Sequence, residues 1–211
     1  MRYSFLFSMV FVLCLAHVLG VYAMTATTED GKQVILNTDG TWKYAPADKK
    51  STAEMGEEWK KPDSATSVLK GKAGFYEVWY DPDKWTPDPS PHNPIVEYSL
   101  VSSSKDGQAT IIAERTAMPL ETLKRAAIEN AKKAAPDLKV IDEQHIKVNG
   151  APVLKMRMHG TIQGIAFAYL GLYWTGKAGA LQVITYTSQN LEEEFRPEFE
   201  KLLSGLVITK P

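Results

Sequence analysis

Three side chains that could carry chemistry alternate along one predicted strand. Lys155, Arg157 and His159 occupy every second position and therefore share one face of that strand. A face with two cations and an imidazole could bind an anion or a carboxylate, or serve a hydrolase-like small-molecule enzyme. The same pattern is also expected of a solvent-exposed sheet face, or of a layer of salt bridges beneath a helix. In the binding interpretation, polar side chains from other strands would complete the pocket: Glu114, Gln182 and Tyr186.

The remaining chemistry-bearing residues show no catalytic or metal-binding pattern. His92, His145 and His159 are the histidines after residue 23, and none has another ligand at a recognised metal-binding interval. The serine triplet 102–104 precedes Asp106-Gly107, which predicts a turn, and the chain contains no Gly-x-Ser-x-Gly motif. We therefore expect a protein that is not an enzyme and holds no metal or cofactor.

Aromatic residues are the other candidates for a binding cleft. Trp85 is the one most expected at a cleft mouth, because it borders the proline-rich residues 86–94, which predict a long loop. Core packing is the alternative for all members of the set: Trp79, Tyr80, Trp85, Tyr173, Trp174 and Tyr186.

The first 23 residues are typical of a secretory signal peptide. Arg2 precedes a mainly apolar segment, and Val21-Tyr22-Ala23 matches a small-residue cleavage site. We expect export to the periplasm or the extracellular space, with no transmembrane segment left after cleavage. Cys14 is the only cysteine and lies in the segment removed, so no disulfide is expected. The 24 basic and 25 acidic residues are balanced, which gives no reason to expect a nucleic-acid partner.

Residues 24–46 predict a short β-hairpin. Asp39-Gly40 separates two apolar segments and supplies the positive φ angles that a tight turn needs. Trp42 and Tyr44 share one face and could dock on the chain's own domain or on a partner in an envelope complex. Residues 47–72 are rich in charge and poor in large apolar groups, which indicates a linker. Residues 73–208 should then fold without residues 24–72.

The order of elements in residues 73–208 predicts an α+β fold, with an antiparallel β-sheet flanked by helices. Several strands precede a helix that begins after Pro119 and ends at Pro136, four antiparallel strands follow, and a second helix starts after Asn190. Residues 164–188 should form the central hairpin, because the outgoing arm is apolar on both faces. The second helix should cover it through Phe195 and Phe199.

This region resembles the PsbP-like superfamily. The resemblance rests on the aromatic run 75–85, on Glu114-Arg115 before Pro119, and on residues 179–187 followed by a helix. It implies a PsbP-like α+β domain over residues 73–208 and a non-enzymatic binding or assembly role, because most members of the superfamily have such roles. It brings no catalytic residues. The partner would be an unidentified protein or small molecule of the cell envelope.

Overall fold

The computed structural model describes residues 24–27, 33–36, 40–44, 57–89 and 93–210, so the predicted signal peptide lies outside the described residues. The chain divides into two units, residues 1–52 and 53–211. No helix within the described ranges is both long and apolar enough to cross a membrane.

The first unit contains a small antiparallel sheet. The predicted pairing across Asp39-Gly40 is present, with Leu36 opposite Trp42, and a further strand adds to its other side. The three strands are β1 (Met24–Thr27), β2 (Gln33–Leu36) and β3 (Trp42–Tyr44). Gly40 has a φ of 83°, the left-handed conformation that glycine adopts without strain.

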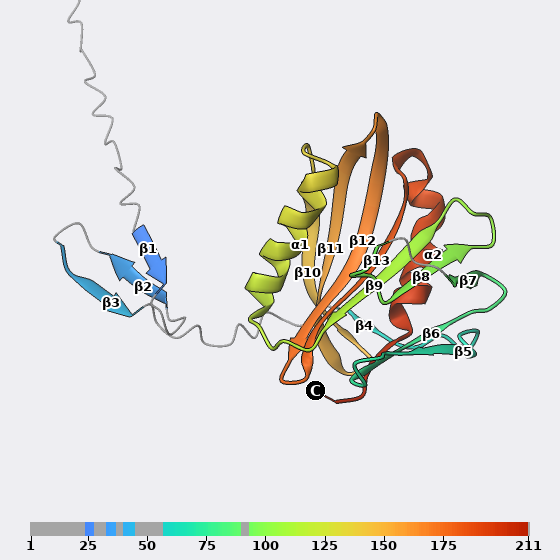
Figure 1. Ribbon diagram of the computed structural model, residues 1–211, viewed down its shortest axis with the longest axis horizontal. Coiled ribbons are helices and arrows are strands. Elements are labelled where there is room, and N and C mark those ends of the chain that lie inside the picture. The colour runs from blue at the N-terminus through green and yellow to red at the C-terminus, as the bar shows by residue number, and fades with distance from the viewer. Residues whose placement is uncertain (1–23, 28–32, 37–39, 45–56, 90–92, 211) are drawn as a thin grey trace, which may run out of the picture. The chain divides into compact units, whose positions relative to one another are not determined.

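The second unit is built on an eight-stranded sheet and two helices (Figure 1). Its spatial order is β4-β10-β11-β12-β13-β9-β8-β7, and a second sheet has the order β14-β6-β5. The strands before the first helix are β4 (Glu58–Trp59), β5 (Ser67–Lys70), β6 (Tyr76–Tyr80), β7 (Trp85–Asp88), β8 (Tyr98–Ser102) and β9 (Gln108–Glu114). The remaining elements are α1 (Leu120–Ala134), β10 (Lys139–Val148), β11 (Ala151–Ile162), β12 (Ile165–Gly176), β13 (Gly179–Ser188), α2 (Glu192–Ser204) and β14 (Leu206–Ile208).

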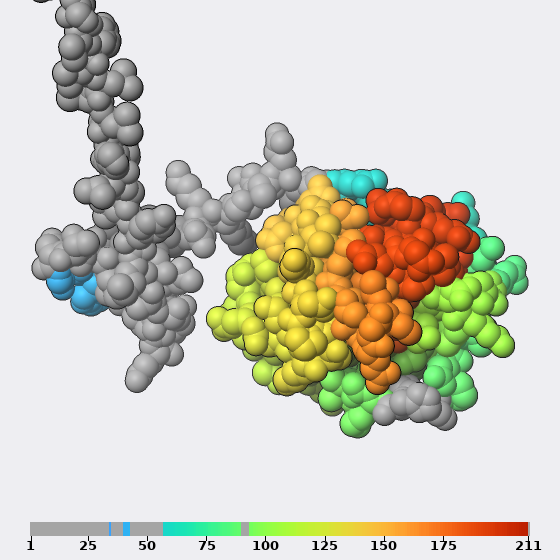
Figure 2. Space-filling model, turned by 90° about the horizontal axis from the view of Figure 1, so that it is seen from above, coloured from blue at the N-terminus to red at the C-terminus, as the bar shows by residue number. Residues whose placement is uncertain are grey.

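The central hairpin is where the sequence predicts it. β12 and β13 occupy the two middle positions of the large sheet. One core cluster joins Leu172 and Val183 to Phe195 and Phe199 of α2. The second cluster joins Tyr173 of β12 to Leu123 and Ala127 of α1. The two helices therefore cover opposite faces of the sheet, and Figure 2 shows α1 (yellow) and α2 (red) on either side of the strands. An outgoing strand that is apolar on both faces needs such double cover.

The turn between β10 and β11 follows from two residues. Asn149 and Gly150 have φ angles of 48° and 84°, as a two-residue primed turn requires. The Asn149 side chain also donates hydrogen bonds to the carbonyls of Ser204 and Leu206, at 2.8 Å each. The turn is thereby tied to the end of α2.

The second half of the expected linker belongs to the folded domain. β4 pairs with the end of β10, and Trp59 is only 7% exposed. β5 pairs with β6 along its whole length. The sequence does not predict these two strands, because β4 is anchored by a single tryptophan and β5 has only two large apolar residues. We therefore propose a domain boundary near residue 56.

Two other local expectations differ from the structure. Residues 86–88, expected as loop, lie in β7 at the edge of the large sheet, where Pro87 is tolerated because an edge strand needs fewer backbone donors. The second helix, expected to start directly after Asn190, begins at Glu192, because residues Gln189–Leu191 form a 3-10 turn. Pro197 lies inside α2, and the helix continues through it.

Candidate functional site

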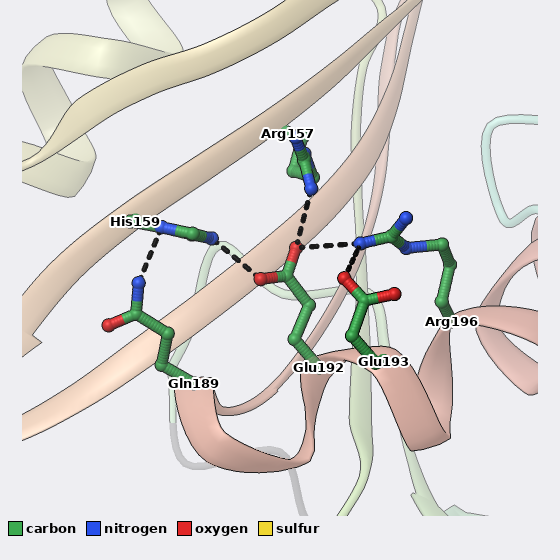
Figure 3. Close-up of polar contacts among 6 residues, drawn as sticks. All are labelled: Arg157, His159, Gln189, Glu192, Glu193 and Arg196. Atoms are coloured by element: carbon green, nitrogen blue, oxygen red, sulfur yellow. Dashed lines mark hydrogen bonds and ion pairs between the residues drawn. The ribbon is translucent and has the colours of Figure 1, made fainter.

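The alternating basic residues of β11 face α2. Arg157 pairs in register with Leu170 and His159 with Ala168, and this places both side chains on the α2 side of the sheet. The start of α2 brings Glu192 against them. Its carboxylate lies 3.3 Å from Arg157 Nη1 and 2.8 Å from His159 Nε2, as Figure 3 shows. Arg196, one helical turn further on, approaches the same carboxylate at 3.7 Å and also pairs with Glu193.

Both ring nitrogens of His159 have partners. The Gln189 amide donates to Nδ1, and Nε2 therefore carries the proton and donates to Glu192. The third basic residue, Lys155, lies over the Trp59 ring with its Nζ 5.2 Å from the ring centroid. The basic face is thus a salt-bridged layer beneath a helix, one of the alternatives that the sequence left open. A cavity of about 150 Å³ beside Glu192 is lined by charges of both signs, Asp142, Lys155, Arg157, Arg196 and Glu200 among them.

The other residues predicted to complete a pocket with Arg157 do not meet it. Tyr186 pairs in register with Tyr169, and Tyr169 with Met158, so these three side chains lie on the α1 side of the sheet. Gln182 lies on that side as well, in register with Tyr173, and is buried. Glu114 is exposed at the end of β9, opposite Ala180. The sheet itself separates the two halves of the predicted pocket.

Trp85 is part of the core rather than a free cleft wall. Its side chain is 2% exposed, and its ring centroid lies 6.0 Å from that of Phe199. It borders a cavity of about 260 Å³ between α2 and residues 62–65 and 81–85. In the first unit, Trp42 is 56% exposed, while the Tyr44 side chain lies outside the described residues. Docking through these two aromatics stays a prediction.

The α1 side of the sheet carries a larger cavity, which we call the α1-face groove. Its volume is about 430 Å³. α1 packs on β12 and on side chains of β11, and Figure 1 shows it away from β8 and β9, so the helix leaves part of this face uncovered. One wall consists of three alanines of α1: Ala127, Ala131 and Ala134. The floor comes from the strands and includes Ile112, Met158, Tyr169, Tyr173, Ile184 and Tyr186.

Three tyrosines of the groove are uncharged. Burial raises the pKa of Tyr169, Tyr173 and Tyr186 above the ordinary phenol value, so all three are neutral at physiological pH. The Tyr186 hydroxyl donates to Gln108 Oε1 at 2.8 Å. The rings of Tyr169 and Tyr186 lie 5.9 Å apart between centroids, in a cross-strand aromatic pair.

Sequence reasoning found Tyr186 and Tyr173 but did not recognise the groove. The available signal was the helical spacing of the small side chains Ala127, Ala131 and Ala134, which by itself predicts only an apolar helix face. Three alanines beside aromatic strands leave space that larger residues would fill. Glu192 was also missed, because its contact with β11 depends on where the second helix packs. No group of three or more acidic, histidine or cysteine residues within the described ranges could hold a metal ion.

The fold and its two helix-covered faces define an α+β domain of known type. Cyanobacterial PsbP (CyanoP) from Synechocystis superposes with a TM-score of 0.54 at 10% identity, over 70% of this chain and 94% of that chain. The similarity shows that the chain has the PsbP-like fold. The Ran-binding protein Mog1p of Saccharomyces cerevisiae matches with a TM-score of 0.49, at 6% identity over 68% of this chain and 95% of that one. LpqN of Mycobacterium tuberculosis, involved in cell envelope biogenesis, matches with a TM-score of 0.42, at 10% identity over 68% and 90%. No protein-family model and no curated protein matches the sequence.

Proposed function

We propose that this protein is an exported, non-enzymatic binding or assembly protein that holds its ligand in the α1-face groove. The groove itself is the observation that carries the proposal. Its volume of about 430 Å³ falls within the range of roughly 300–1,000 Å³ found for small-molecule sites. Its floor belongs to the central strands of the sheet, which are rigid elements and can hold a preformed site.

The chemistry of the opposite face supports binding rather than catalysis. His159 would be the natural general base, but Gln189 and Glu192 occupy its two ring nitrogens. Both oxygens of Glu192 are in turn engaged by cations or by His159. A general acid or base must form a hydrogen bond with the substrate, and the atoms of His159 and Glu192 that could do so are already bonded to each other or to neighbouring side chains. Export is supported by the signal-peptide pattern of residues 1–23.

Native mass spectrometry of the protein purified from the envelope fraction of its own host tests the proposal. The wild-type chain should carry the added mass of a small ligand. Ala131→Trp places an indole in the groove and should remove that mass, whereas Ala126→Trp, on the exposed side of the same helix, should keep it. Circular dichroism establishes that both variants are folded. A wild-type protein without added mass, or a folded Ala131→Trp variant that retains it, would contradict the proposal.

A further inference from the structure

The groove wall carries almost no charge. Among the described residues that line it, Asp88 is the only one with a side chain that is charged at neutral pH, and none of them is lysine, arginine or histidine. The smaller cavity on the other side of the sheet, by contrast, is lined by Lys155, Arg157 and Arg196. An anionic head group in the α1-face groove would lose hydration without gaining a counter-ion, which is costly. The wall therefore selects against carboxylate, sulfonate and phosphate groups.

Most of the remaining wall is apolar. Ile112, Met158, Ile162 and Ile184 come from β9, β11 and β13 of the large sheet, and the alanines of α1 line the same groove. The rings of Tyr169 and Tyr186 add flat surfaces on which an apolar or aromatic body could pack. These surfaces favour a hydrophobic body over a sugar or a nucleotide.

One residue that lines the groove has a buried polar atom without a partner among the described residues. The Tyr173 side chain is completely buried, and its hydroxyl has no hydrogen-bond partner among the described residues. A Cβ atom at Gly171 would lie 3.0 Å from that oxygen, so the absence of a side chain at Gly171 leaves the hydroxyl its space. Buried hydroxyls are normally hydrogen-bonded. The Tyr186 hydroxyl already donates to Gln108, and of the three groove tyrosines Tyr173 is the one whose hydroxyl is both buried and without a partner among the described residues, so Tyr173 is the phenol best placed to donate to a ligand.

We propose that the α1-face groove binds a neutral, mainly apolar small molecule with one hydrogen-bond-accepting oxygen, and that Tyr173 donates its proton to that oxygen. This inference rests on the function proposed above and adds the chemical class of the ligand. It also assigns to Tyr173 a role in selecting that class.

Three fluorescent probes separate the components of this proposal. N-phenyl-1-naphthylamine is neutral and has no oxygen, and 1-anilinonaphthalene-8-sulfonate has the same skeleton with an added negative charge. Prodan is a neutral naphthalene with a ketone oxygen. Titrated into the full chain, both neutral probes should bind, and the sulfonate should bind at least about tenfold more weakly than its neutral counterpart. Ala131→Trp should abolish binding of the neutral probes, and Ala126→Trp should not.

The Tyr173→Phe variant tests the hydrogen bond. Its affinity for Prodan should fall about 3- to 10-fold, the usual effect of losing one neutral hydrogen bond, while its affinity for N-phenyl-1-naphthylamine should not change. An equal loss for both probes would overturn the donor role of Tyr173 and indicate a packing defect.

The outcomes for ligand class and for function are distinct. If the sulfonate bound as tightly as its neutral counterpart, the charge argument would be wrong, although an Ala131-dependent added mass in the native protein would still support a binding function. If no probe bound the wild-type chain while that added mass was present, the ligand class would be overturned alone. If the added mass were also absent, the function would fail with it.

Discussion

Replacing Phe199 by alanine tests how much α2 contributes to the stability of the domain. The Phe199 side chain is 3% exposed, and its ring centroid lies 5.4 Å from Phe195 and 6.0 Å from Trp85. The substitution deletes a buried ring and leaves a cavity between the helix and the sheet. Deleting a buried phenylalanine costs about 3–5 kcal/mol. Because two aromatic contacts are lost as well, we expect a decrease of about 4 kcal/mol in the free energy of unfolding.

Urea denaturation followed by circular dichroism measures this decrease. With a slope of about 2 kcal/mol per molar urea, a loss of about 4 kcal/mol moves the midpoint down by roughly 2 M. The matched control is Lys201→Ala, an exposed position of the same helix, which should stay within about 0.5 kcal/mol of the wild type. Phe199→Ala with stability within about 1 kcal/mol of the control would refute the reasoning, because the helix could not then be covering the sheet at this position.

Three further predictions follow from the ion pairs, the groove and the domain boundary. Glu192→Gln should lower the free energy of unfolding by about 1–3 kcal/mol, because it weakens the contacts of a carboxylate that is only 14% exposed. Glu193→Gln, at a side chain 79% exposed, should change it by no more than about 0.5 kcal/mol, and equal effects in denaturation would contradict the salt-bridged layer. Burial raises the pKa of Tyr173 above 10.0, so the unfolded chain loses this proton at a lower pH than the folded chain does. The free energy of unfolding should therefore fall as pH rises above 10.0. This fall should be smaller in Tyr173→Phe, and an equal fall in both proteins would argue against a buried phenol. A chain of residues 56–211 should unfold cooperatively. A chain that begins at Lys72 should not, because that shorter chain lacks β4 and β5. Identical thermal transitions of the two chains would place the domain boundary after β5.

Local patterns in the sequence predicted most of the second unit. Asn149-Gly150 marks a hairpin because the turn chemistry lies in the two residues themselves. The shared face of Arg157 and His159 follows from the two-residue period of a strand, whatever the strand packs against. The apolar character of β12 on both faces correctly placed it in the middle of the sheet.

Features that depend on packing or register could not be predicted in the same way. The sequence indicates that Tyr186 and Arg157 lie on strands, but only the pairing through β12 determines that they face opposite sides of the sheet. Glu192 meets His159 because of the position at which α2 packs. Pro87 argued against a strand, yet β7 lies at the sheet edge, where a proline is tolerated.

Methyl NMR of the full chain titrated with N-phenyl-1-naphthylamine tests the central claim most directly. Ile111 and Ile112 are adjacent in β9 but lie on opposite faces, with Ile111 in the α2-side core and Ile112 in the α1-face groove. Binding in the groove predicts that the methyl signals of Ile112 and Ile184 shift while those of Ile111 and Val183 stay in place. Shifts confined to Ile111 and Val183, or no shift at any of the four at saturating probe, would contradict the claim that this protein binds its ligand in the α1-face groove.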